Sequence, residues 1–272
     1  MTNNSITEGK RGEAVRKIES AHDRATVILV HGAFEHSGRY HDLVEQLQKD
    51  GYSVIYGDLP GQGESSGKKG HIRSFHDYVN TIQLWLQQAD PNKKVFLLGH
   101  SMGGLAVVRF MQVVQPDVDG VVLSSPALGI LNKASAPLNA ASYILNMLIP
   151  ALRIKAPQNP AYITRNKDKI TEYSQDPLIV DRVSVRWYRE FQKAIIEAFN
   201  DINLFPDVPL LVMQAEEDYM VEVNKTSDWF DKVNVKEKRY KQWPGLYHEI
   251  YNEPEWRDVY EYTLSFLDDQ LK

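Results

Sequence analysis

The sequence predicts an α/β fold whose central sheet is mostly parallel and is covered by helices on both faces. Short apolar runs alternate with stretches in which apolar residues recur with a period near 3.6. The apolar run at 95–98 passes through a glycine-bounded turn directly into an apolar helix. The alternation is interrupted once, over residues 127–205, where no convincing strand is found.

The first half of the chain follows the strand–helix alternation closely. Residues up to Arg24 are mostly polar and offer only short edge strands around 14–18. After them, the apolar runs predict strands at 26–30, 52–56, 95–98 and 120–124. Between these strands, helical periodicity predicts helices at 39–49, around 75–86 and at 105–114.

Residues 127–205 are predicted to form a helical cap insertion between two parts of the core, 1–126 and 206–272. One helix is expected at 185–199, and leucines recur at helical spacing over 138–152. The second stretch has two interpretations: a plain buried helix, or a helix that lines an acyl tunnel or touches a membrane surface.

The alternation returns after residue 205. Strands are predicted at 209–213 and 235–240, and helices at 226–233 and 255–271. These elements complete a sheet with helices on both faces.

Composition excludes several classes of function. The net charge of −5 leaves no basic footprint for nucleic acid, and the absence of cysteine removes disulfides and thiol catalysis. No metal or organic cofactor is expected. Without a secretory signal or a run long enough to span a bilayer, the expected location is the cytoplasm, with peripheral membrane contact through the cap as a further possibility. Nothing in the sequence indicates an oligomeric state.

The turn Gly99-His-Ser-Met-Gly103 matches G-x-S-x-G between a buried strand and a buried helix. A reversal this sharp strains its central residue and tolerates no Cβ at its flanks, so it presents the Ser101 hydroxyl as a nucleophile. The segment 63–67 also matches the pattern, but no strand precedes it and no apolar helix follows it. We therefore interpret 63–67 as a loop.

A serine nucleophile needs a base, and the base needs an acid that orients it. In folds with this turn the chain order is serine, acid, histidine. Only His248 follows Ser101, so it is the predicted base. The strand at 209–213 leads into three carboxylates at 216–218. Asp218 is preferred and Glu217 is the main alternative.

An oxyanion needs two backbone N–H donors. Met102, directly after the nucleophile, supplies one of them. The dipeptide His31-Gly32 follows the first core strand and makes the Ala33 amide the predicted second donor.

Several longer segments resemble the monoacylglycerol lipase and lysophospholipase branch of the α/β-hydrolase superfamily. The similar segments span most of the chain after residue 26: 31–40 (HGAFEHSGRY), 58–65 (DLPGQGES), 70–75 (GHIRSF), 164–166, Tyr173, 176–178 and 245–254 (GLYHEIYNEP). One departure is Gln62, where the family usually has histidine.

This resemblance implies an α/β-hydrolase fold with Ser101, Asp218 and His248 as the triad. It implies the Ala33 and Met102 amides as the oxyanion hole. It also places Glu35 and Arg39 near the polar pocket for the glycerol side, and it favours the tunnel interpretation of 138–152.

The predicted function is hydrolysis of carboxylic esters through an acyl-enzyme, on a small lipid ester such as a monoacylglycerol or lysophospholipid. One rival is a broad carboxylesterase for short acyl chains. Another is a ligand receptor built on a hydrolase fold, which would not turn over repeatedly. A dehalogenase or epoxide hydrolase is disfavoured because those enzymes use aspartate where this chain has Ser101.

Overall fold

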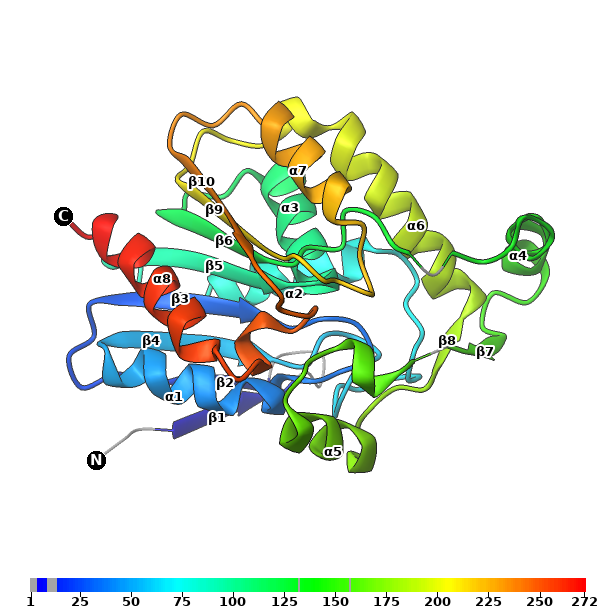
Figure 1. The fold of residues 1–272 in the computed structure, drawn as a ribbon, viewed down its shortest axis with the longest axis horizontal. Coiled ribbons are helices and arrows are strands. Elements are labelled where there is room, and N and C mark those ends of the chain that lie inside the picture. The colour runs from blue at the N-terminus through cyan, green and yellow to red at the C-terminus, as the bar shows by residue number, and fades with distance from the viewer. Residues whose placement is uncertain (1–3, 9–13, 132, 157) are drawn as a thin grey trace.

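The computed structural model describes residues 4–8, 14–131, 133–156 and 158–272. Within them, an 8-stranded sheet has the order β1-β2-β4-β3-β5-β6-β9-β10 (Figure 1). Its strands are β1 (Asn4–Glu8), β2 (Ala14–Ile18), β3 (Ala25–Val30), β4 (Tyr52–Gly57), β5 (Lys94–His100), β6 (Gly120–Ser124), β9 (Leu210–Ala215) and β10 (Lys238–Trp243). The pairs β1–β2 and β2–β4 are antiparallel, and all other neighbours are parallel. The predicted mostly parallel sheet is confirmed.

Helices cover both faces of this sheet. One face carries α1 (His41–Lys49) and α8 (Trp256–Asp269), and the other carries α2 (His76–Leu86), α3 (Met102–Val114), α6 (Val185–Asn200) and α7 (Val223–Lys232). Strand β3 shows how the pleat divides the core. Its Val27 and Leu29 pack in the cluster of α1 and α8, whereas Ile28 and Val30 pack in the cluster of α2 and α3.

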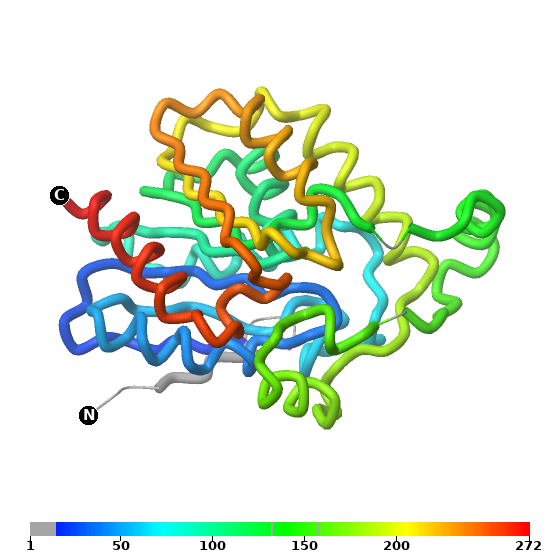
Figure 2. The backbone as a smooth tube through the Cα atoms, in the orientation of Figure 1, coloured from blue at the N-terminus to red at the C-terminus, as the bar shows by residue number. Residues whose placement is uncertain are grey.

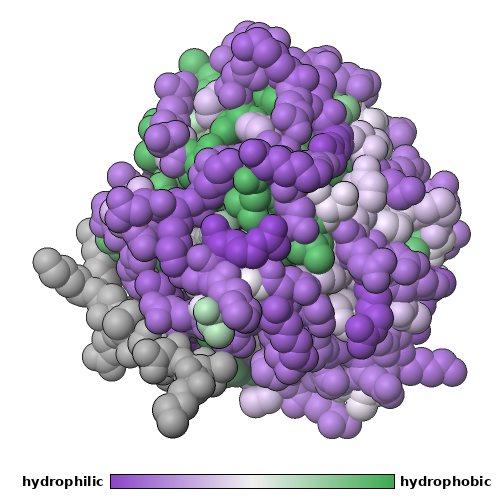
Figure 3. All heavy atoms as spheres, turned by 90° about the vertical axis from the view of Figure 1, so that its left-hand side faces the viewer, coloured by the Kyte–Doolittle hydropathy of each residue, from purple (hydrophilic) through white to green (hydrophobic). Residues whose placement is uncertain are grey.

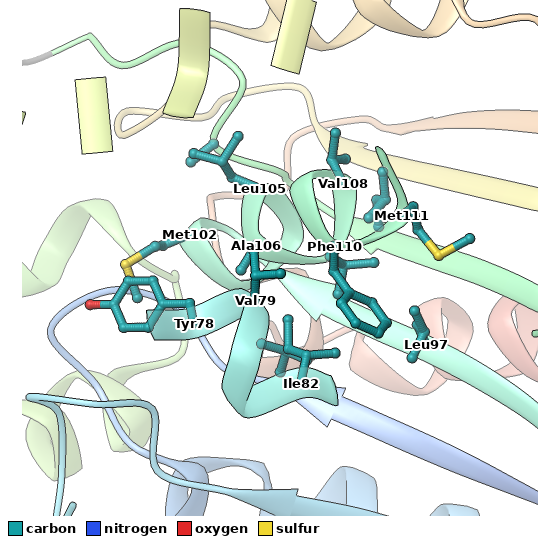
Figure 4. Close-up of a cluster of buried hydrophobic side chains, with 14 of the residues drawn as sticks. Tyr78, Val79, Ile82, Leu97, Met102, Leu105, Ala106, Val108, Phe110 and Met111 are labelled. Atoms are coloured by element: carbon teal, nitrogen blue, oxygen red, sulfur yellow. The ribbon is translucent and has the colours of Figure 1, made fainter. Parts of the chain in front are cut away.

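Helix α3 is buried along most of its length because α2 and α6 pack beside it while β5 lies beneath. In Figure 4, Ala106 and Phe110 of α3 lie close to Val79 and Ile82 of α2, whereas Leu105 and Val108 point away from α2. A helix enclosed in this way is a rigid support for the turn that precedes it. Truncation of Phe110 to alanine would cost about 3–5 kcal/mol.

Several predicted boundaries differ from the structure, and two of the differences have a clear physical reason. The helix expected at 39–49 is a 3₁₀ turn, η1 (Ser37–Tyr40), followed by α1. The last strand begins at Lys238 rather than at residue 235. Val235 is buried in the core but lies outside the strand ladder, so its hydrophobicity reports burial and not pairing.

The connecting segment, residues 127–205, contains more than helices. Its elements are α4 (Ala136–Leu148), β7 (Arg153–Lys155), η2 (Pro160–Tyr162), α5 (Lys167–Gln175), β8 (Arg182–Ser184), α6 and η3 (Ile202–Leu204). The expectation that it holds no strand was wrong, because β7 and β8 pair antiparallel. Each of these strands has three residues with a single central aliphatic side chain, too short a pattern to detect.

Helix α4 stands away from the sheet, at the right of Figure 1. Of its residues only Ser142 is buried, so the buried-helix interpretation of this stretch was wrong. No helix in the described part of the chain is long and apolar enough to cross a membrane.

Candidate active site

The candidate site lies at the carboxyl edge of the sheet, where several loops meet. Strands β3, β5 and β9 are neighbours or near neighbours and run in the same direction, so their ends point to one place. Ala33 follows β3, Ser101 follows β5 and Asp218 follows β9. His248 lies in the loop between β10 and η4 (Ile250–Asn252).

The turn after β5 has the predicted strained geometry. Ser101 has φ 53° and ψ −119°, a region that costs a non-glycine residue about 1–3 kcal/mol. A Cβ on Gly103 would lie 2.2 Å from the Val30 carbonyl oxygen, and one on Gly99 would lie 2.7 Å from the Gly103 carbonyl oxygen. Only glycine fits at these two positions, which explains the spacing of the motif.

Three side chains predicted to act together are in contact. Ser101 Oγ lies 2.8 Å from His248 Nε2, and His248 Nδ1 lies 2.8 Å from Asp218 Oδ2. Asp218 Oδ1 accepts hydrogen bonds from the N–H groups of Met220 at 2.8 Å and Val221 at 2.9 Å. Since a carboxylate can only accept, His248 Nδ1 carries the proton and Nε2 is free to accept one from Ser101.

The competing carboxylates point elsewhere. Glu216 and Glu217 are exposed, and Glu216 Oε2 accepts from the Gly245 N–H at 3.1 Å. Asp218 is buried and also accepts from the Gln214 side-chain amide at 3.0 Å. The choice of Asp218 over Glu217 as the partner of His248 therefore agrees with the geometry, and Gln214 is a contributor that sequence reasoning missed.

The two histidines at the site, His248 and His100, have pKa values shifted in opposite directions. Burial alone would lower the pKa of His248, but the charge and hydrogen bond of Asp218 outweigh it and raise this pKa above its usual value. Burial likewise opposes ionisation of Asp218, yet His248 and the amide donors hold its pKa below the usual range. Burial and the nearby His248 lower the pKa of His100 to about 4, so His100 stays neutral.

The predicted oxyanion donors flank Ser101. A Cβ on Gly32 would lie 3.2 Å from Ser101 Cβ, which puts the Gly32–Ala33 peptide beside the nucleophile. The Gly32 carbonyl oxygen lies 2.8 Å from His31 Nδ1, and the Leu59 N–H donates to His31 Nε2 at 2.9 Å. His31 Nδ1 must therefore donate to that carbonyl, which fixes the peptide plane that carries the Ala33 N–H. Burial lowers the pKa of His31 and keeps this neutral form.

Glu35 and Arg39, predicted to lie at the polar end of the substrate pocket, form a buried ion cluster. Glu35 Oε1 accepts from the Gly32 N–H and the Tyr40 hydroxyl, both at 2.6 Å. Arg39 bonds Glu35 Oε2 at 2.7 Å and holds Glu249 in a bidentate pair at 2.6 and 2.7 Å. Glu249 was not foreseen, although it follows His248 directly.

This cluster links the loop after β3 to the histidine loop. Although burial opposes its ionisation, Arg39 lowers the pKa of Glu249 to about 2. Glu35 and Glu249 both line the cavity described below, whereas Arg39 lies behind them. Their predicted contact with substrate stays a prediction.

A largely apolar cavity of about 400 Å³ opens beside Ser101 and His248. This volume lies within the usual range for small-molecule sites. Its apolar wall comes from the loop after β3, from the connecting segment and from the loop after β9, and includes Phe34, Ala127, Ile130, Leu138, Ile154, Ile163, Val183, Trp187, Tyr188, Phe191, Met220 and Val221. Among the described residues, no cluster of histidine and acidic side chains could hold a metal ion.

Residues 21–255 match the family model described as serine aminopeptidase, S33. The chain belongs to this family. Its members are serine hydrolases, and the predicted branch of the α/β-hydrolase superfamily is confirmed by the relatives.

This hydrolase is 43% identical over 249 residues to phospholipase YtpA of Bacillus subtilis, covering 91% of the chain and 96% of the relative. It is 30% identical to human monoglyceride lipase, covering 85% of the chain and 77% of the relative. The crystal structure of Paleococcus ferrophilus monoacylglycerol lipase superposes with a TM-score of 0.85 at 32% identity, covering 93% and 99% of the two chains. This hydrolase is therefore a carboxylic ester hydrolase of the lipase and lysophospholipase type.

Proposed function

We propose that Ser101, His248 and Asp218 are the catalytic triad of an enzyme that hydrolyses monoacylglycerols or lysophospholipids with medium to long acyl chains. The observation that carries this proposal is the chain of two 2.8 Å contacts from Ser101 through His248 to Asp218, open to an apolar cavity. The names of the relatives support the substrate class.

In the proposed reaction, Ser101 Oγ attacks the ester carbonyl carbon while His248 Nε2 takes its proton. The Ala33 and Met102 N–H groups stabilise the resulting oxyanion, each donor being worth about 3 kcal/mol of the barrier. His248 then protonates the leaving alkoxide, and the alcohol departs from an acyl-enzyme. A water molecule, deprotonated by His248, releases the fatty acid and restores Ser101. Asp218 keeps its charge throughout and stabilises the imidazolium.

The cavity favours this proposal over a short-chain carboxylesterase. Its walls are mostly aliphatic and aromatic, and it extends from Ser101 to Leu138 of α4 and Phe191 of α6. An acetyl group would leave most of this apolar surface in contact with water, whereas a long acyl chain would cover it. Each buried methylene stabilises the complex by roughly 0.8 kcal/mol.

We further propose that α4 contacts a lipid surface during substrate uptake. Met147 is 82% exposed, Leu148 73% and Ile144 61%. The opposite side of the molecule, beside α8, is mostly hydrophilic (Figure 3). Arg153 and Lys155, in β7 just after this helix, could meet anionic headgroups at the same surface.

The proposal is tested by hydrolysis of a monoacylglycerol series and of lysophosphatidylcholine, with Ser101→Ala as the blank. We expect steady multiple turnover that increases from short to medium acyl chains and vanishes in the variant. Activity that is flat or falls with chain length would favour the short-chain esterase, and a single slow acylation without turnover would favour a receptor.

A further inference from the structure

Phe34 is a strained residue one position beyond the Ala33 amide. Its φ of 70° lies in the left-handed region, which a residue with a Cβ occupies only when its surroundings enforce it. Proteins keep such conformations mainly where they serve a site. Three contacts enforce this one, one from the loop after β4 and two from the connecting segment.

The backbone of Phe34 is held from both sides. Its N–H donates to Gln62 Oε1 at 3.0 Å, and Gln62 lies in the core loop after β4. Its carbonyl oxygen accepts from the Val180 N–H at 2.8 Å, and Val180 lies in the connecting segment between α5 and β8. Gln62 is completely buried, so the first of these bonds is shielded from water.

The ring of Phe34 supplies the third contact. Its centroid lies 5.4 Å from that of Trp187 on α6, and Trp187 stacks in turn on Phe191 at 5.1 Å. All three rings line the cavity beside Ser101. An acyl chain in the cavity would therefore touch the side chain whose backbone adjoins the Ala33 amide.

We propose that Phe34 is a positioning residue through which the acyl chain aligns the oxyanion hole, so that chain length raises the rate of acylation and not only substrate affinity. This inference rests on the proposed function, because it needs the Ala33 amide as an oxyanion donor. An acyl chain packed on the Phe34 ring excludes water from it and holds the strained backbone in place. Binding energy from a remote part of the substrate is then realised at the reacting carbonyl.

The test is the single-turnover acylation rate at saturating enzyme with p-nitrophenyl acetate, butyrate and octanoate, which share one leaving group. In the wild type we expect octanoate to acylate roughly tenfold faster than acetate, a smaller effect than the 10²–10³ that accompanies loss of a whole oxyanion donor. In Phe34→Ala the ring is absent, and we expect the octanoate-to-acetate ratio to fall to about 1.

A second variant changes the same ratio in the opposite direction. Gln62→Leu removes the acceptor of the Phe34 N–H but leaves the ring, so alignment depends more on the acyl chain. We expect acetate to lose more rate than octanoate, and the ratio to exceed that of the wild type. Circular dichroism and thermal unfolding report whether each variant folds, and if Phe34→Ala does not fold, Gln62→Leu decides.

Tyr188→Ala is the matched control, because Tyr188 also lines the cavity from α6. We expect it to raise the enzyme concentration needed for half-maximal octanoate acylation and to leave the limiting ratio unchanged. The inference is overturned if Phe34→Ala keeps the wild-type ratio, if it changes only half-saturation, or if Gln62→Leu lowers the ratio. Release of p-nitrophenolate by Ser101→Ala would instead contradict the proposed function.

Discussion

Two parts of the connecting segment differ in how they attach to the core. The anchored part, residues 160–180, contains α5 and lies beside the loops that carry the site (Figure 2). The free part, residues 136–148, is helix α4. Both are helical and both follow β6 in the chain, yet only the first is bonded to the candidate catalytic loops.

The anchored part is fastened at several points. The Glu249 N–H donates to the Ile163 carbonyl at 2.7 Å, and Thr164 Oγ1 donates to the Asn252 carbonyl at 2.9 Å. At its other end, His36 Nε2 lies 2.6 Å from Asp176 Oδ2. The Arg39 guanidinium lies 4.8 Å from the centre of a ring of α5, that of Tyr173. This part therefore holds both the histidine loop and the loop after β3.

The free part rests on α6 alone among the elements with which it shares substantial contact. Arg186 donates to Asn146 at 2.7 Å and Arg189 to Asn139 at 2.9 Å, while Ile144, Met147 and Leu148 are exposed. One connecting segment thus has two parts of different character: the anchored part is bonded to the loops of the site, and the free part keeps an exposed apolar surface.

Among the variants that test this comparison, the largest loss of stability is expected where the anchored part meets the ion cluster of Glu35, Arg39 and Glu249. Glu249→Ala would remove the bidentate acceptor of Arg39, which packs on Tyr173 of α5, and leave Glu35 as its only partner in the cluster, so we expect the free energy of unfolding to fall by about 2–3 kcal/mol. Chemical denaturation measures it. Glu255→Ala removes a half-exposed carboxylate from Arg165 and should cost at most about 1 kcal/mol. Equal losses in the two variants would show that the ion cluster does not anchor this part.

The pH dependence of kcat/KM should be set by His248 at the site and should not depend on α4. His248 must be neutral to accept a proton, so kcat/KM should rise with pH through its raised pKa, with a midpoint above 6.5 and about tenfold loss per pH unit below it. The contribution of His248 to the free energy of unfolding has the opposite pH dependence. Because its pKa is raised in the folded protein, His248 stabilises the fold fully below pH 6.5, and this stabilisation is lost as the pH rises through the pKa of the folded state. For Glu249, whose pKa is lowered to about 2, the stabilisation is present above 4.5 and is lost as pH falls toward 2.

The midpoint of the pH profile of kcat/KM is measured with an ester that is dissolved as single molecules, in the wild type and in Met147→Ser. We expect the same value in both proteins, because α4 does not touch His248. A shifted midpoint in the variant would mean that the free part is coupled to the site.

A smaller loss of stability is expected when one buried hydroxyl of the anchored part, that of Thr164, is removed. Thr164→Val removes the donor to the Asn252 carbonyl and the acceptor of the Asn166 N–H, and should lower the free energy of unfolding by about 1–2 kcal/mol. The matched control is Thr171→Val on the exposed side of α5, whose hydroxyl bonds only the Lys167 carbonyl. We expect its effect to stay within about 0.5 kcal/mol. Thermal unfolding compares the two variants, and a larger loss in Thr171→Val would contradict the expected anchoring.

The smallest effect on stability is expected on α4. Met147→Ser should change the free energy of unfolding by less than about 0.5 kcal/mol, because this side chain is already exposed. Sedimentation with anionic phospholipid vesicles should nevertheless show weaker binding than for the wild type. Val113→Ser, at an exposed site on α3, controls for loss of any apolar surface group. Equal binding by both variants would remove the lipid-surface role proposed for α4.

Local sequence patterns predicted much of this fold and site. Gly99 and Gly103 identified the strained turn because their Cβ positions meet backbone atoms, a constraint that holds wherever a strand reverses into a helix so closely. His248 followed from chain order alone. Two strands and one α-helix of the connecting segment were missed. Strands β7 and β8 are too short for any periodicity to register, and α5 (KDKITEYSQ) is mostly polar.

Sequence patterns could not predict other features of the site. Glu249 looks like any polar loop residue until folding brings Arg39 against it, 210 positions earlier in the chain. Gln214 and His31 support the site through bonds whose partners depend on tertiary packing. Helix α4 has the same leucine spacing as a core helix, yet among the described residues no element covers its outer side, so it is exposed.

The sequence by itself determined the order of the strands and helices of the core, the position of the sharp turn and the one histidine that follows it in the chain, because these depend on steric limits, short-range periodicity and chain order. Tertiary structure decided which carboxylate faces His248, how Phe34 is held in its strained conformation, and which part of the connecting segment is fastened. Those outcomes depend on groups distant in the chain, whose burial and pairing exist only once the sheet and its loops have assembled.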